Sequence, residues 1–163
     1  MKVKIKELAQ ESLAPAIEIW NAVVEEGLAF PQMELLDYNS GRSFFGQQSY
    51  TGVAYDAGTD EVVGLYILHP NNVGRCGHIC NASYAVKKDR RGMHIGESLV
   101  KHSIEIGKKS GFSILQFNAV VKSNKAALAL YKKIGFVQLG IIPRGFLLKD
   151  GTYEDIIPHY IEL

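Results

Sequence analysis

The chain lacks any apolar run long enough to cross a bilayer, and its first residues alternate lysine with apolar side chains instead of forming the apolar segment of a secretory signal. It also lacks an excess of charge: 18 basic residues face 17 acidic ones, for a formal net charge of +1. A polyanion partner is recognised through a concentrated basic patch, which this sequence does not have. We therefore expect a cytoplasmic protein that binds neither membrane nor nucleic acid.

Cysteine is scarce as well, with only Cys76 and Cys80 on either side of His78. In a β-strand these three side chains would share one face, because successive side chains alternate, and a zinc site is then one interpretation. Such a site would need a fourth ligand or water, and the spacing matches no common zinc motif. Reduced thiols of a cytoplasmic protein are the better interpretation, so we expect no metal.

What is present is typical of a soluble globular protein: 47% hydrophobic and 21% charged residues, with no repeats or linkers. The length suits one domain, residues 1–163. Periodicity and turn signals predict strands at 1–7, 50–55, 61–69, 79–86, 113–121, 136–148 and 152–162, and helices at 13–26, 38–48, 95–110 and 125–134. This order predicts an α/β fold built on a sheet of mixed direction.

The segment from Val86 to Gly96 joins a predicted strand to a predicted helix through arginines and glycines. The first N–H groups of a helix have no intrahelical partner, and the helix dipole favours negative charge there. Glycine also lets the backbone approach a phosphate closely. The segment is thus a candidate phosphate site, although an ordinary strand-to-helix loop explains the same residues equally well.

The same segment resembles motif A of the GNAT superfamily, the acyl-CoA-dependent N-acetyltransferases, in which a strand-end Val precedes Arg/Gln-x-x-Gly-x-Gly/Ala. The matching residues are Val86, Arg91, Gly92, Ile95 and Gly96. His94 stands where the family usually has glycine. Residues 124–136 resemble motif B of the family, with its Asn, its Tyr and its closing Gly-Phe. The resemblance implies a GNAT-like single domain, with a central mixed and mostly antiparallel twisted sheet of about seven strands flanked by about four helices.

The resemblance also implies an activity: transfer of acetyl from acetyl-CoA to a primary amine of a small molecule, by direct attack in a ternary complex. The small-molecule acetyltransferases of the phosphinothricin and amino-acid type are the most similar subgroup. A protein or peptide N-acetyltransferase and a non-catalytic acyl-CoA-binding regulatory module are the alternatives. Whether the protein is a monomer or a homodimer is left open.

The resemblance assigns the cofactor contacts residue by residue. The backbone of Ala85 and Val86 would lie against the pantetheine and the thioester carbonyl, where an N–H can hold the developing oxyanion. The pyrophosphate would be bound by Arg91, Gly92, Met93, His94, Ile95 and Gly96. Asn118, Asn124 and Tyr131 complete the set, although Asn124 serves equally well as a helix N-cap. If position 94 requires a positive φ, histidine tolerates it better than most residues do, and the imidazole can also donate to a phosphate.

Tyr131 is the candidate general acid, because the motif-B tyrosine can protonate the departing thiolate. The alternative is that it only packs in the core, on the helix face that it shares with Ala127 and Ile134. Glu26, at the end of the first predicted helix, is the candidate general base. Other candidates are Glu25 and His78 as bases, and Asn81 and Tyr84 as residues that hold a water. By analogy the apolar segment 27–48 would line the acceptor site, unless it only packs onto the sheet.

Overall fold

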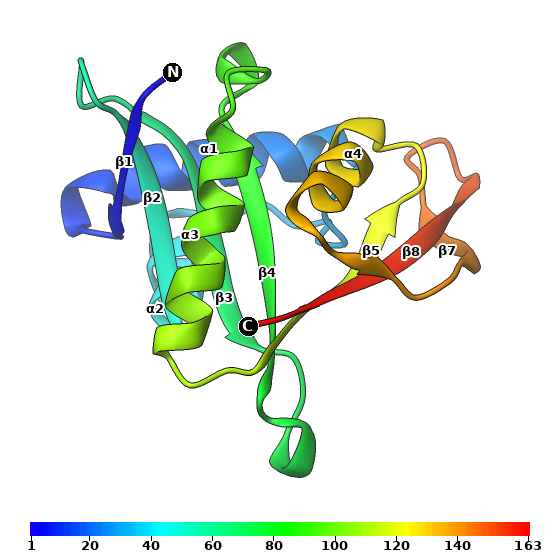
Figure 1. Ribbon diagram of the computed structural model, residues 1–163. Helices are drawn as coiled ribbons and strands as arrows, with labels where there is room; N and C mark the ends of the chain where they lie inside the picture. Colours follow the sequence, from blue (N-terminus) through cyan, green and yellow to red (C-terminus); the bar gives the residue numbers. More distant parts are fainter.

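The computed structural model describes all 163 residues and contains eight strands and four α-helices (Figure 1). The strands are β1 (Val3–Glu7), β2 (Tyr50–Asp56), β3 (Val62–Pro70), β4 (Ile79–Val86), β5 (Ile114–Val121), β6 (Val137–Gln138), β7 (Ile142–Leu147) and β8 (Tyr153–Glu162). The helices are α1 (Leu13–Glu26), α2 (Tyr38–Gly46), α3 (Ile95–Lys109) and α4 (Lys125–Ile134). No helix is long and apolar enough to cross a membrane.

All eight strands belong to one sheet, in the order β1-β2-β3-β4-β5-β8-β6, with β7 pairing the other part of the same edge of β8. Only β4 and β5 are parallel, and every other pair is antiparallel. The prediction of a mixed, mostly antiparallel sheet in an α/β fold is therefore confirmed.

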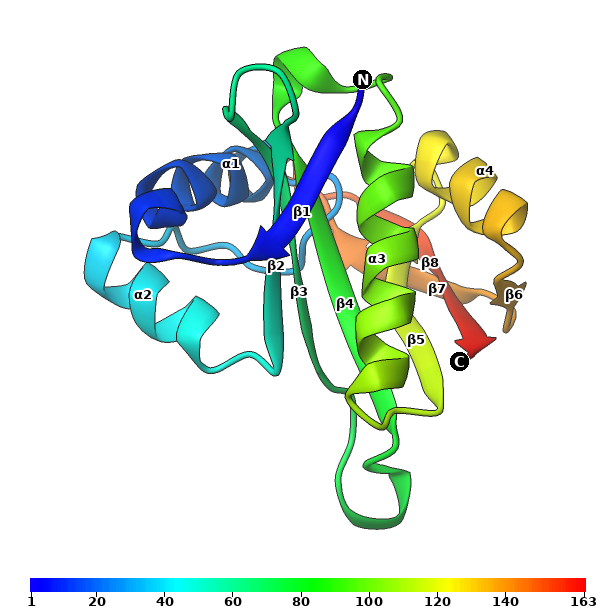
Figure 2. The ribbon, with the colours of Figure 1, turned by 60° about the vertical axis from the view of Figure 1, so that its left-hand side comes forward.

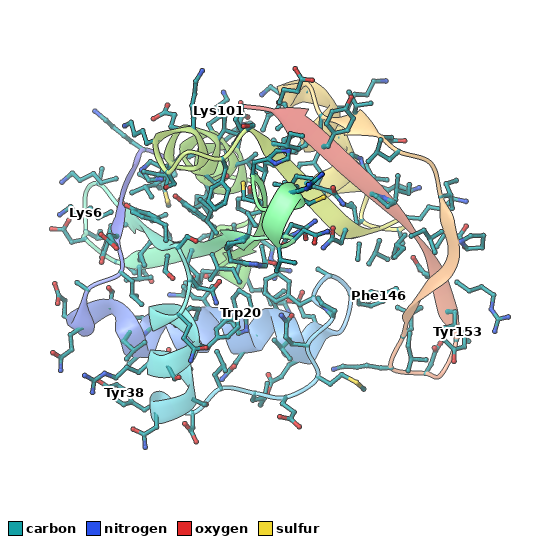
Figure 3. The ribbon with its side chains drawn as sticks, turned by 90° about the horizontal axis from the view of Figure 1, so that it is seen from below. Lys6, Trp20, Tyr38, Lys101, Phe146 and Tyr153 are labelled. Atoms are coloured by element: carbon teal, nitrogen blue, oxygen red, sulfur yellow. The ribbon has the colours of Figure 1, made fainter.

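Helices cover both faces of the sheet, α1 and α2 on one and α3 and α4 on the other (Figure 2). Between the first pair and the sheet lies an aromatic cluster around Trp20, which is 1% exposed (Figure 3). Its ring centroid is 4.3 Å from that of Phe30, 5.1 Å from Phe44 and 5.8 Å from Phe45. Successive side chains of a strand point to opposite faces of the sheet, and here both faces are covered, so a hydrophobic core lies on each side.

Two predicted elements differ from those observed. The single strand predicted at 136–148 is two strands, because Gly140 takes a left-handed φ of +100° between β6 and β7. Helix α2 ends at Gly46 and not at the predicted residue 48, and its Gly41 lies where α2 approaches α1. A Cβ at Gly41 would stand 2.4 Å from Cδ1 of Ile17, so the glycine permits close packing of the two helices.

Gly52 tests how tightly the centre of the sheet is packed. A Cβ there would stand 2.2 Å from Cε1 of Tyr66, a fully buried ring whose hydroxyl is 2.8 Å from Nδ1 of His102. We expect Gly52→Ala to lower the free energy of unfolding by about 1–3 kcal/mol, because that ring cannot move aside. Gly46→Ala is the control, since a Cβ at Gly46 meets nothing within 4 Å. Urea unfolding of both variants decides, and equal midpoints would contradict the argument.

Candidate active site

The sheet opens between its two parallel strands. β4 and β5 pair only at Ile79↔Ile114 and Cys80↔Leu115, and beyond these residues no backbone pairing joins them. The side chain of Asn81 spans the start of the gap, where its amide donates to the carbonyl of Gln116 at 2.8 Å. Past this point the backbone of each strand is available to a ligand on the side that faces the other strand.

A cavity of about 730 Å³ lies at this opening, between the loop that follows β4, the first turns of α3 and α4, and the end of α1. Its volume is within the range of about 300–1,000 Å³ that is usual for ligand sites. Of the residues predicted to bind cofactor, it is lined by Val86, Arg91, Gly92, His94, Ile95, Gly96, Asn124 and Tyr131. Ala85 and Met93 pack in the core nearby, and Asn118 lies elsewhere.

The N-terminus of α3 is not capped by a side chain. The first helical hydrogen bond runs from the N–H of Ser98 to the carbonyl of His94 at 3.2 Å, and the N–H groups of Ile95, Gly96 and Glu97 have no protein acceptor. Gly92 and His94 both take left-handed φ angles, +77° and +62°, which turn the backbone into the helix. Free N–H groups at the wall of a cavity are the arrangement that binds phosphate oxygens.

His94 therefore adopts the positive φ considered from the sequence. Its side chain is 78% exposed, and Nδ1 lies 3.5 Å from Oε2 of Glu97. The imidazole thus points toward solvent and a carboxylate while the backbone carries the turn.

Arg91 and Glu26, the predicted cofactor and base residues, form an ion pair. Each terminal nitrogen of Arg91 lies 3.0 Å from one carboxylate oxygen of Glu26, and Nε donates to the carbonyl of Val86 at 3.4 Å. The ion pair joins the loop after β4 to the end of α1. Both residues line the cavity of about 730 Å³, which is called the larger cavity below. Sequence reasoning missed this pairing, because the two residues are 65 positions apart and no motif links them.

The neighbouring arginine has a different role. Arg90 bonds to Oε2 of Glu61 at 2.6 Å, and Lys87 pairs with the other oxygen of the same carboxylate. These contacts, from Lys87 first and Arg90 second, hold the pKa of Glu61 below its ordinary value. They anchor the loop after β4 to the start of β3.

Tyr131 lines both the larger cavity and a second, smaller cavity beside it, which is described below. Its ring packs against Phe117, Phe136 and His159, at centroid distances of 4.5, 5.4 and 5.7 Å. Burial raises the pKa of the phenol, so that it stays protonated at neutral pH. Its hydroxyl has no hydrogen-bond partner in the protein. Tyr131 is therefore both packed in the core and free to donate a proton.

Asn124 performs the capping role that the sequence left as an alternative. Its Oδ1 accepts from the N–H of Ala127 at 3.2 Å at the start of α4. The residue also lines both cavities.

The remaining candidates are less well placed. The hydroxyl of Tyr84 is 2.7 Å from Oγ of Ser103, so it is already engaged, and burial raises its pKa well above the usual value. Glu25 and His78 are exposed and line neither cavity. Cys76 lies in a short 3-10 turn and the buried Cys80 donates to the carbonyl of Ile114, so the two thiols are apart in the fold. No three His, Cys, Asp or Glu side chains are grouped to hold a metal ion.

The second cavity, of about 180 Å³, lies beside the segment that follows α1 and shares Tyr131 and Asn124 with the larger one. Three residues of the segment 27–48 line it: Ala29, Phe30 and Pro31. Phe44 and Phe45 pack against Trp20 instead. Of the segment expected to line an acceptor site, only the part directly after α1 reaches a cavity.

Comparison with known proteins agrees with this geometry. Residues 15–136 match the acetyltransferase (GNAT) family, and the chain belongs to that family. It is 28% identical over 167 residues to the N-acetyltransferase aca1 of Schizosaccharomyces pombe, covering 93% of this chain and 79% of the relative.

Two solved structures show the same fold. A GCN5-related N-acetyltransferase from Kribbella flavida is 26% identical, with a TM-score of 0.89 over 99% of this chain and 98% of that one. A phosphinothricin acetyltransferase from Sinorhizobium meliloti, solved with acetyl-CoA, is 18% identical, with a TM-score of 0.90 over 100% and 89%. The predictions of family, fold and enzyme class are therefore confirmed.

Glu97 ties the two helices of the larger cavity together and provides a test by pH. Its carboxylate bonds to Lys101 and to Lys133, each at 2.7 Å, and these lysines lower its pKa from 4.5 to about 2. A lowered pKa means that the ionised group stabilises the fold above its ordinary pKa, and that this stability is lost as the pH falls toward the lowered value.

We therefore expect Glu97→Gln to unfold at lower urea concentration than the native protein at neutral pH. The difference should shrink as the pH falls below about 4.5 and disappear near pH 2. Glu18→Gln, on the exposed face of α1 and without an ion pair, is the control. A difference that does not vary with pH would mean that the ion pairs are not its cause.

Proposed function

We propose that this GNAT acetyltransferase moves acetyl from acetyl-CoA to a primary amine of a small molecule, by direct attack in a ternary complex. The observation that carries the proposal is the pair of cavities that meet at the opening between β4 and β5. The larger has the free helix N-terminus that suits a pyrophosphate, and the smaller has room only for a compact group.

The donor fits the larger cavity on two grounds. The N–H groups of Ile95, Gly96 and Glu97 would bind pyrophosphate oxygens, and the cavity volume suits a large ligand. When bound, acetyl-CoA supplies an activated thioester carbonyl.

One backbone group of β4 is suited to polarise that carbonyl. The N–H of Lys87 bonds to the carbonyl of Val63 in β3, so in antiparallel pairing the N–H of Ala85 also points to β3 and that of Val86 points away, toward the opening. Val86 rather than Ala85 is thus the proposed oxyanion donor.

In the proposed reaction the amine nitrogen forms a bond to the carbonyl carbon, and the carbon–sulfur bond breaks. Tyr131, protonated and without another partner, would give its proton to the departing thiolate. The proton of the amine would pass to water, since no carboxylate or imidazole lines the smaller cavity. Glu26 would act as a base only through water and after leaving Arg91.

Substitution of Glu26 tests whether this residue is the general base or only the partner of Arg91. We expect acetyl-CoA to raise the melting temperature by mass action, and Glu26→Gln to tighten acetyl-CoA binding by up to about tenfold, because the freed Arg91 can then bind phosphate. We expect the kcat of Glu26→Gln to be less than about tenfold below that of the native protein. Glu25→Gln, beside it and outside both cavities, is the control.

Calorimetry and steady-state kinetics of these variants separate the alternatives. A loss in kcat of about a hundredfold or more, with unchanged acetyl-CoA affinity, would make Glu26 the general base. If saturating acetyl-CoA leaves the melting temperature of the native protein unchanged, the proposed function itself is wrong.

Tyr131→Phe keeps the packed ring and removes the proton donor. We expect kcat to fall by about a hundredfold or more, with little change in acetyl-CoA affinity, because only the general acid is lost. Tyr153→Phe, an exposed ring of β8 outside both cavities, should leave kcat unchanged. If the two variants have equal turnover under conditions where chemistry limits the rate, Tyr131 serves in packing alone.

A further inference from the structure

The two cavities differ sharply in charge. The larger is lined by Glu26, Arg90, Arg91, Glu97 and Lys125, together with neutral residues. Among the 15 residues of the smaller cavity none carries a formal charge. Its polar side chains are amides and hydroxyls: Asn81, Ser83, Tyr84, Asn118, Asn124 and Tyr131.

Two of these amides, Asn81 and Asn118, belong to a hydrogen-bonded cluster with Asn71 and Gln116 at the opening. Asn118 in β5 exchanges hydrogen bonds of 2.7 and 3.2 Å with Asn71, directly after β3, and accepts a third from Gln116 at 3.1 Å. Asn81 in β4 donates to the backbone of Gln116 at 2.8 Å. These mutual bonds fix the orientation of each amide before a ligand arrives.

The cluster retains hydrogen-bonding capacity for a ligand. A side-chain amide has two N–H donors and one oxygen acceptor. Asn81 uses one donor, which leaves its oxygen and a second N–H free, and Asn118 also uses one donor and keeps one. Two residues that line the smaller cavity therefore retain at least one acceptor and two donors, all neutral.

Such a lining selects ligands by charge. The free amide oxygen of Asn81 can accept a hydrogen bond from one ammonium group. The two free amide N–H groups can bind one carboxylate. A second positive charge, or a phosphinate in addition to a carboxylate, would need a countercharge that no lining residue supplies. Size restricts the ligand further, since the cavity has a volume of only about 180 Å³.

We propose that the acetyl acceptor is a compact amine of net charge zero or +1, recognised through the neutral amides of Asn81 and Asn118. This inference rests on the proposed function, and it assigns the acceptor to the smaller cavity. It includes monoamines and zwitterionic amino acids, and it excludes polyamines and phosphinothricin.

The test compares acceptors at saturating acetyl-CoA. Isobutylamine represents the monoamines, L-threonine the zwitterions, spermidine the polycations, and phosphinothricin the amino acids that carry a second anionic group. We expect kcat/KM for isobutylamine or L-threonine to exceed that for both spermidine and phosphinothricin at least tenfold. The better of the first two identifies the subclass. A higher value for spermidine or phosphinothricin overturns the inference.

A protein that acetylates none of the four, while acetyl-CoA still raises its melting temperature, also overturns the inference and leaves cofactor binding intact. If acetyl-CoA has no effect on melting, the proposed function fails instead.

Variants link the selectivity to the amides. Asn118→Leu and Asn81→Leu should each lower kcat/KM for the preferred compact acceptor at least tenfold, mainly through KM, with an unchanged melting shift by acetyl-CoA. Asn118→Asp keeps the shape and adds a negative charge, and it should raise kcat/KM for spermidine relative to the compact acceptor at least tenfold. Asn39→Leu, an exposed asparagine of α2 without side-chain hydrogen bonds, is the control. Folded Leu variants with native KM, or an Asp variant with native selectivity, would contradict the assignment.

Discussion

The site exists because two parallel strands separate after two residue pairs. β4 and β5 are held together only at Ile79–Ile114 and Cys80–Leu115, while their outer neighbours hold each strand along most of its length. Separation leaves backbone N–H and C=O groups without partners, which a folded chain normally avoids. The groups on the facing sides must bond to water or to a ligand. The interior of the sheet thus becomes a binding surface, and both cavities open onto it.

The separation also divides the polar chemistry of the protein. In the larger cavity, most charged groups are paired, with Arg91 bonded to Glu26 and Glu97 bonded to two lysines, so a ligand there must compete with existing partners. In the smaller cavity, the polar groups are neutral amides and hydroxyls, and Asn81 and Asn118 are held by hydrogen bonds to neighbouring residues. A charged cavity and a neutral cavity that share Tyr131 suit a reaction between a highly charged donor and a small acceptor. The phenol lies at the boundary, where burial keeps it protonated.

Local signals predicted most of the fold, and contacts between distant residues explain the rest. Helix α4 was predicted at its observed bounds, because Asn124 is a strong N-cap and Gly135 takes the left-handed conformation that ends a helix. Motif A predicted the residues of the larger cavity for the same reason, since a strand, a loop and a helix start are adjacent in sequence. The ion pair of Arg91 with Glu26 and the four-residue amide cluster join separate elements, and no spacing rule reports them. Asn118, predicted as a cofactor residue, lines the smaller cavity.

His94 shows how the loop tolerates a departure from the family pattern. A left-handed conformation at a non-glycine residue costs about 1 kcal/mol or more and persists only where its surroundings impose it. Here they do: Lys87 and Arg90 anchor the loop to Glu61, Gly92 turns the chain beforehand, and the fully buried Ile95 begins α3 immediately afterwards. The backbone geometry at the helix N-terminus is therefore set from both sides, so its N–H groups can face the larger cavity without a glycine at position 94. The side chain points to solvent and leaves the free N–H groups at the helix N-terminus accessible.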